Sequence, residues 1–249
     1  MRLAGSVFLC LVNTAYGVEN LAYIEQMGDQ QSASVFQSGS GNQSSLEQIA
    51  LTSDLGGMGS LSQLSQSGIN NTITVTQDVS NNYSAIAQTG NYNQATLVQA
   101  SIDNVAYITQ TSDNNTIRVS QDNLINSTAT PGNYVSASQT GSFNMIDIMQ
   151  SGALNNVQLA QSDMNNYIYL SQTGEENWIN VIQSAGNNQA QIEQNGNANQ
   201  VNLAQTGPYN YAGVTQLGNN NIANIVQMGS GHTLNMTQSG GISITVTQP

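Results

Sequence analysis

The feature that most constrains the fold of this chain is a column of glutamines spaced eleven residues apart. From Gln139 to Gln238 the spacing never changes, and Asn stands six residues before each Gln except at His232. Apolar residues alternate between the two columns, as in Asn144-Met-Ile-Asp-Ile-Met-Gln150. A period of two indicates a short β-strand with one buried face, and a fixed spacing indicates stacked copies of one unit. The sequence therefore predicts an array of strands.

The Gln and Asn columns are the candidate ladders of the core. Because side chains alternate along a strand, Gln and Asn share the face of the apolar residues two and four positions before each Gln. Each buried amide could then bond its copy in the next unit, which would satisfy polar groups that are costly to bury. The predicted ladder residues are Gln139, Gln150, Gln161, Gln172, Gln183, Gln194, Gln205, Gln216, Gln227 and Gln238 with Asn144, Asn155, Asn166, Asn177, Asn188, Asn199, Asn210 and Asn221.

The array spans residues 18–249, with short loop insertions expected near 54–59 and 127–132, where the Gln spacing rises from eleven to eighteen. Both insertions follow odd-numbered strands, the third and the ninth, so Gly57 and Pro131 are expected at the same edge of the array. The first and last units keep the strand pattern and are the candidate assembly edges. Their inward residues are Asn20, Ala22, Ile24 and Gln26 at one end and Ile242, Ile244, Val246 and Gln248 at the other.

A single unit of eleven residues cannot bury its apolar face, but two facing units can. The predicted fold is therefore all-β, a β-solenoid of about ten 22-residue strand-turn-strand rungs that form two facing parallel sheets, as in amyloid. The turn sequences indicate that the two halves of a rung are unequal. Even-numbered strands are followed by similar sequences such as QTGSFN, whereas the sequences after odd-numbered strands vary more. Gly recurs two residues after Gln, where a tight turn needs positive φ.

Composition separates this chain from ordinary enzymes and from disordered polar tracts. Asn and Gln make up about a quarter of the residues, charged residues are 6%, and Lys is absent. Such tracts are often disordered, but the strict apolar period argues against disorder here. The charges within strands fall on outward positions, at Glu25, Glu47, Arg118, Asp147 and Glu193. The excess of acids makes nucleic acid a poor partner, because phosphates would meet no compensating charge.

Residues 1–17 are predicted to be a secretory signal peptide. Arg2 precedes an apolar run, and Ala15-Tyr-Gly17 resembles a cleavage site. No stretch is long enough to span a bilayer as a helix, and Cys10 would leave with the signal. The mature chain is therefore expected to be secreted and to fold without disulfides.

No catalytic residue, cofactor site or metal site is predicted. His232 has no His or Cys partner for a metal and is interpreted as a tolerated replacement in the Asn ladder. The pair Glu175-Glu176 fits a solvated turn better than an acid–base pair. With one His in the chain, the many Ser and Thr residues cannot build a hydrolytic triad, so we expect no enzymatic activity.

In its repeat pattern the sequence resembles the curlin family, the subunits of curli fibres on bacterial surfaces. The family repeat reads Gln-x-Gly-x-Gly-Asn-x-Ala, then three residues and Gln; Gln37-Ser-Gly-Ser-Gly-Asn42 matches its first part, and residues 88–99 match nearly all of it. The resemblance covers residues 20–248. It implies export through an outer-membrane pore, self-assembly into an extracellular functional amyloid, a second curlin subunit as partner, and roles in biofilm matrix and adhesion.

Two departures concern the subunit type. The Gly-rich targeting segment of the major subunit is missing after the signal, and the ending Ile244-Thr-Val-Thr-Gln248 is more similar to the minor, nucleating subunit. An alternative function is a non-polymerising secreted solenoid that binds a surface or ice. A regular outward array, commonly of Thr, would favour that reading, whereas the outward positions here are mixed. Tyr83, Tyr134 and Trp178 share one outward column, which either supports the sheet surface or forms an adhesive face.

Overall fold

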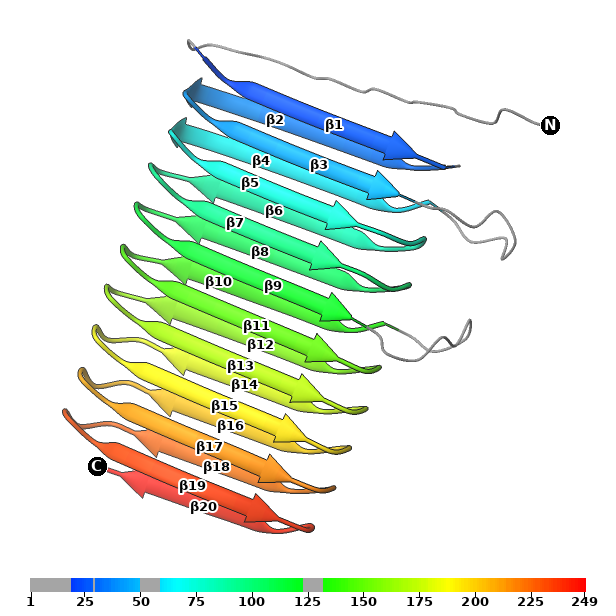
Figure 1. Ribbon diagram of the computed structural model, residues 1–249. Coiled ribbons are helices and arrows are strands. Elements are labelled where there is room, and N and C mark those ends of the chain that lie inside the picture. Colours follow the sequence, from blue (N-terminus) through cyan, green and yellow to red (C-terminus); the bar gives the residue numbers. More distant parts are fainter. Residues whose placement is uncertain (1–18, 29, 50–58, 123–131) are drawn as a thin grey trace.

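The computed structural model describes residues 19–28, 30–49, 59–122 and 132–249. Within these ranges the chain forms twenty β-strands in two ten-stranded parallel sheets (Figure 1). The odd sheet contains β1 (Leu21–Met27), β3 (Gln43–Ile49), β5 (Thr72–Gln77), β7 (Gln94–Gln99), β9 (Thr116–Asp122), β11 (Met145–Ser151), β13 (Tyr167–Thr173), β15 (Gln189–Asn195), β17 (Tyr211–Leu217) and β19 (Thr233–Ser239). The even sheet contains β2 (Ser32–Ser40), β4 (Leu61–Ile69), β6 (Tyr83–Thr89), β8 (Val105–Thr111), β10 (Tyr134–Thr140), β12 (Asn156–Ser162), β14 (Trp178–Gln183), β16 (Gln200–Gln205), β18 (Ile222–Gln227) and β20 (Ser243–Gln248).

Consecutive strands lie in opposite sheets, so one odd strand, one even strand and their turns form a rung. Each strand pairs with the strand two places along the chain, and the pairing places Gln on Gln, as with Gln139 between Gln110 and Gln161. This arrangement confirms the predicted all-β solenoid of about ten 22-residue rungs with two facing parallel sheets. The register keeps the same side-chain face inward along the whole stack. A shift of one residue would expose all of the inward apolar side chains of a strand, so this register is strongly preferred.

A thin apolar core lies between the sheets. The position two residues before each Gln carries a long aliphatic side chain in most rungs, such as Leu46, Ile108 and Ile192, and these are at most 1% exposed. The position four residues before it varies from Ala to Ile, for example Ala106 and Ile117. Burial of these aliphatic surfaces is the main favourable contribution to folding.

Three buried serines interrupt this apolar pattern in the early rungs. Ser62 and Ser84 stack in the even sheet with their hydroxyl oxygens 2.7 Å apart, and Ser44 donates to Oε1 of Gln66 at 2.7 Å. These hydrogen bonds satisfy hydroxyl groups that the core encloses. The sequence analysis assigned such positions to apolar residues and did not identify the serines as core.

The turns carry left-handed backbone at two places. The residue two after Gln is usually Gly, with φ of +98° at Gly39. The residue before the ladder Asn is left-handed in most turns whatever its type, as at Phe143 and Glu176, but not at Gly132. The turn after β13, in the odd sheet, contains Gly174 at φ +113°, whereas Gly207 after β16 does not have positive φ. The predicted difference between turns after even and odd strands therefore does not hold for the backbone conformation.

The inserted segments flank equivalent positions. Gly59 lies against the carbonyl of Gln30, and Gly132 lies against the carbonyl of Asp103. Both interruptions fall between an odd strand and the next even strand, β3 and β4 or β9 and β10, so the described residues that flank them lie at the same edge of the solenoid. Gly57 and Pro131 themselves lie outside the described residues.

The turn glycines give a prediction about stability. A Cβ on Gly39 would lie 2.0 Å from the carbonyl oxygen of Gly68, whereas a Cβ on Gly218 would come no closer than 3.6 Å to any atom of the neighbouring rung. Both glycines are left-handed, so Gly39→Ala and Gly218→Ala share a backbone cost of about 1–2 kcal/mol. We expect Gly39→Ala to lower the free energy of unfolding by about a further 1–3 kcal/mol. Urea denaturation followed by circular dichroism measures both, and equal losses would contradict the close-packing argument.

Candidate functional site: amide ladders and assembly edges

The Gln side chains form one continuous hydrogen-bonded column in each sheet. Nε2 of each Gln donates to Oε1 of the Gln in the next rung, as in Gln150 to Gln172 at 2.9 Å and Gln172 to Gln194 at 2.9 Å. The direction is the same throughout, with the donor on the N-terminal side and the acceptor on the C-terminal side. These amides are buried, so the bonds form in a medium of low dielectric where water does not compete.

A second bond from the same amide joins the two sheets. Nε2 of Gln150 in the odd sheet also donates to the backbone carbonyl of Tyr134, at the start of the preceding even strand, at 3.1 Å. Gln183 in the even sheet does the same to the carbonyl of Tyr167 at 3.3 Å. An interior Gln of this kind therefore connects adjacent rungs and also connects the end of its own strand to the facing sheet.

The Asn column uses a different bonding pattern. Oδ1 of each Asn accepts the backbone N–H of the Asn in the next rung, as in Asn177 to Asn199 at 3.1 Å, and Nδ2 of Asn177 donates to the carbonyl of Gly196 at 2.7 Å. The expected bonding of Asn to Asn through side chains alone is secondary. The Asn side chains hold the turns of successive rungs in place because their partners are turn backbone groups.

Four residues replace Asn in its column, and three of them are polar. The Ser60 hydroxyl takes both roles, accepting from the N–H of Asn82 at 3.2 Å and donating to Val79 at 2.8 Å. Oε1 of Gln31 accepts the N–H of Ser60 at 2.9 Å. The backbone N–H of His232 donates to Oδ1 of Asn210 at 2.8 Å. Ring Nε2 of His232 lies 2.8 Å from the carbonyl of Pro249.

The proposed assembly edges lie at opposite ends of the stack (Figure 1). Strands β1 and β2 form the N-terminal edge, and β19 and β20 form the C-terminal edge. Ala22 and Ile24 at one end and Val246 at the other are partly buried and pack against the core cluster. Oε1 of Gln26 is buried and has no hydrogen-bond partner, because it faces the side on which the preceding rung of its sheet would lie.

Charge is distributed unequally between the outer faces of the two sheets. The five charged residues expected to point outward do so, and all five belong to odd-sheet strands. The Tyr23 hydroxyl donates to the Glu25 carboxylate at 2.6 Å, and this hydrogen bond, with the negative charge of Glu25, raises the pKa of Tyr23. The outward positions of the even-sheet strands carry no charged side chain. The sequence analysis did not separate the two faces, although the parity of the strand number contained that information.

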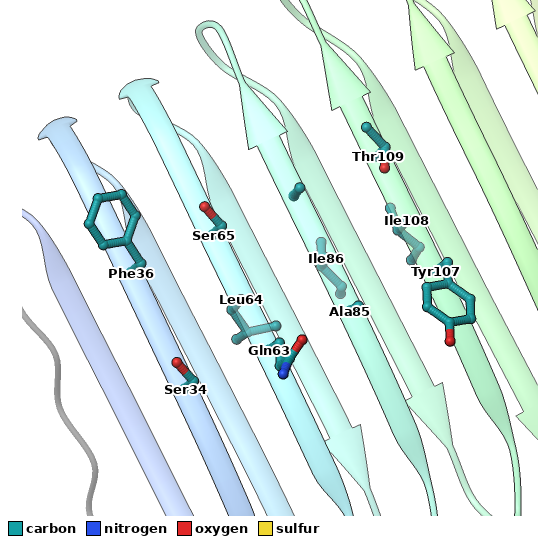
Figure 2. A pocket seen from close by; sticks show the side chains of 11 residues that line it. Ser34, Phe36, Gln63, Leu64, Ser65, Ala85, Ile86, Tyr107, Ile108 and Thr109 are labelled. Atoms are coloured by element: carbon teal, nitrogen blue, oxygen red, sulfur yellow. The ribbon is translucent and has the colours of Figure 1, made fainter.

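The outer face of the even sheet instead carries aromatic residues beside a shallow hollow. The Tyr83 and Tyr107 ring centroids are 5.3 Å apart, and those of Tyr107 and Tyr134 are 6.0 Å apart. Figure 2 shows Phe36 and Tyr107 on either side of short side chains such as Ser65 and Ala85. The hollow has a volume of about 370 Å³. Trp178 lies in the same strand column as Tyr83 and Tyr134.

In the described residues, His, Asp and Glu side chains do not gather in groups of three or more that could hold a metal ion. The same part of the chain contains no helix long and apolar enough to cross a membrane. The arrangement that the structure does build is a pair of polar ladders with two open ends.

The Gln ladder gives a second prediction. Gln183 bonds Gln161 at 2.8 Å, Gln205 at 2.7 Å and the carbonyl of Tyr167, so Gln183→Leu leaves buried groups of both neighbouring amides without partners. We expect this change to lower the free energy of unfolding by about 2–4 kcal/mol. Asn180→Ser, on the outward face of the same strand, should change it by less than about 0.5 kcal/mol. Chemical denaturation of the two variants tests the difference, which vanishes if the ladder does not contribute to stability.

Comparison with protein families agrees with the repeat seen in the structure. The Curlin associated repeat matches residues 17–49, 68–100 and 196–229. Each matched segment is about one and a half rungs long and contains the Gln and Asn ladder positions described above. No curated protein shows a significant match to the chain. The three matched segments cover 100 of the 249 residues, and these parts of the chain are similar to the curlin repeat.

Proposed function

We propose that the chain is a curli-type subunit that assembles end-on into extracellular functional amyloid fibres. The observation that carries this proposal is the pair of open ends on a solenoid with curlin repeats. Residues 1–17 serve as the secretory signal in this proposal, and an outer-membrane pore exports residues 18–249. The fibre then contributes to biofilm matrix, adhesion and aggregation, as the family resemblance implies.

The direction of the Gln ladder supports head-to-tail stacking. Within the chain, Nε2 groups point toward the C-terminal edge and Oε1 groups toward the N-terminal edge. Gln238 of one copy could therefore donate to Gln26 of the next, whose Oε1 is buried and has no partner. Such a heterologous contact does not close on itself, so repetition produces a filament. The strand spacing would remain near 4.8 Å across each junction.

The subunit is of the major or the nucleating type in this proposal. The last strand, β20, which ends in Thr-Val-Thr-Gln248, is more similar to the nucleating type. A second curlin subunit is then the natural partner besides other copies of this chain. The mixed outward columns, such as Ser34, Gln63, Ala85 and Tyr107 in the even sheet, do not favour a regular ice-binding array.

The proposal predicts that the mature chain at micromolar concentration forms unbranched fibres within days. Sedimentation follows the loss of free chain, and fibre diffraction measures the spacing expected near 4.8 Å. Deletion of residues 241–249 removes β20 and should slow nucleation or elongation, because the C-terminal edge then presents one strand fewer. A folded monomer that persists under these conditions would instead favour the isolated solenoid.

A further inference from the structure

The C-terminal edge departs from the bonding rule of every junction inside the solenoid. At interior junctions the Asn-column side chain accepts the backbone N–H of the next rung, as at Asn199 to Asn221 (3.0 Å). The last two acceptors that follow this rule are Asn210, which serves the N–H of His232, and Asn221, which serves the N–H of Ile242 at 3.2 Å. His232 and Ile242 therefore occupy the two Asn positions that would meet another copy.

The two residues differ as acceptors. Ile242 has no polar side-chain atom. Ring Nε2 of His232 lies 2.8 Å from the carbonyl of Pro249, to which it can only donate, so Nδ1 of the neutral ring remains an acceptor. Ile242 is therefore the residue that removes the Asn acceptor.

Gln238 does not differ from interior Gln residues in this way. Its Nε2 lies 2.8 Å from the carbonyl of Ile222 and 3.0 Å from that of Ile242, and Gln121 makes the same two kinds of bond while it also donates to Gln150. The Gln ladder can therefore continue across the junction, and the missing acceptor at Ile242 distinguishes the C-terminal edge.

The N-terminal edge is not satisfied in the same way. By the periodicity of the stack, the backbone N–H groups of Asn20 and Gln31 would face the positions of His232 and Ile242 in a preceding copy. Oε1 of Gln26 and Nε2 of Gln31 are buried and have no partner. Burying a backbone N–H against an isoleucine side chain leaves a donor unpaired, which opposes association.

We infer that Ile242 acts as a brake on self-association, making the junction between two copies weaker than any junction between rungs of one copy. This inference rests on end-on stacking, and it adds a regulatory feature to that mode of assembly. The N-terminal edge would bind more tightly to a solenoid whose last rung keeps Asn at both positions than to a second copy of this chain.

The test is to restore the missing acceptor. The variant Ile242→Asn should extend preformed wild-type fibres faster and leave at least about fivefold less free chain at the plateau, which corresponds to about one neutral hydrogen bond. The control Ser243→Asn adds the same amide one residue later, on an exposed outward position. Ile242→Ser keeps the test valid if the last turn does not accommodate Asn, because the Ser60 hydroxyl accepts the N–H of the next rung inside the solenoid.

The outcomes separate the inference from the proposed function. A lower concentration of free chain at the plateau for the acceptor variants, but not for the control, supports the brake. Fibres from wild type with an unchanged plateau in both acceptor variants overturn the brake and leave end-on assembly standing. Persistent monomers in wild type and in every variant overturn end-on assembly, and the brake with it.

An independent observation concerns the outer face of the even sheet. Its strands carry no charged side chain, although the chain has a formal net charge of −12 and the odd sheet exposes charged residues. Two copies that approach through their odd sheets bring carboxylates together, whereas the even sheets meet without charge repulsion. The exposed rings of Phe36 and Tyr107 stand beside Ala85 and Ala87, so raised and hollowed areas occur on one face (Figure 2).

The size of this face suits a specific contact between two copies. Ten strands at about 4.8 Å and roughly 17 Å of strand length give about 800 Å² per copy, which matches one side of a standard-size interface. We propose that the even sheet of a second copy covers this face, in a two-fold contact between identical surfaces. The contact would pair filaments laterally and does not require end-on stacking.

Matched charge insertions test this surface. Ala87 and Thr76 each immediately precede a ladder Gln. Ala87 lies in β6 of the even sheet, and Thr76 lies in β5, the preceding strand of the chain, in the odd sheet. Ala87→Glu should convert paired filaments into single ones in electron micrographs, or dimers into monomers in sedimentation velocity, while Thr76→Glu leaves pairing unchanged. Seeded elongation should be the same in both variants. Single wild-type particles, or equal loss of pairing in both variants, would overturn the proposal.

Discussion

The whole structure depends on the buried glutamine amide that bonds in two directions. One N–H reaches the next Gln of the same sheet, and the amide nitrogen also bonds the backbone of the facing sheet, as Gln150 does with Gln172 and Tyr134. Without such a partner an amide inside the core would destabilise the fold. With it, the same group specifies the register of each rung and the distance between the sheets. The ladder therefore allows a core as thin as two aliphatic positions per strand.

The ladder also explains why the chain tolerates so few kinds of residue inside and so many outside. An inward position touches the rungs on both sides, so a substitution such as Ser60 persists because its hydroxyl both donates and accepts. The outward positions contact solvent and vary from Glu47 to Trp178 without a change in the strand pairing. Close contact between turns has a similar effect, since Gly68 lies against the carbonyl of Gly90 and leaves no room for a side chain.

Because every Gln bond has the same direction, the two ends of the solenoid differ chemically. The N-terminal edge presents the buried acceptor of Gln26, and the C-terminal edge presents amides that already bond backbone carbonyls. A stack of identical copies has a defined polarity for this reason. Ile242 adds a second difference, since it removes one Asn acceptor at the C-terminal edge but leaves interior rungs intact. The hydrogen bonds that stabilise the rungs of one chain therefore differ from those available between two chains.

The sequence by itself determined the period, the inward face and the two-strand rung. These are properties of a single strand and its copies, because alternation specifies which side chains share a face and equal spacing specifies the register. The identity of the aligned residues, such as Gln139 on Gln161, was readable before any coordinates. The assignment of the strand charges to the odd sheet was readable too, from the parity of the strands.

Only the tertiary structure decided how each polar group is satisfied. An Asn at position 177 can bond its copies or the backbone of a turn, and the choice of the Asn199 N–H and the Gly196 carbonyl depends on the next rung being in place. The same holds for the bond from Gln150 to the facing sheet and for the burial of Ser44 and Ser62. Periodicity specifies where a side chain points, whereas the partner of an amide depends on distances between strands that lie far apart in the sequence.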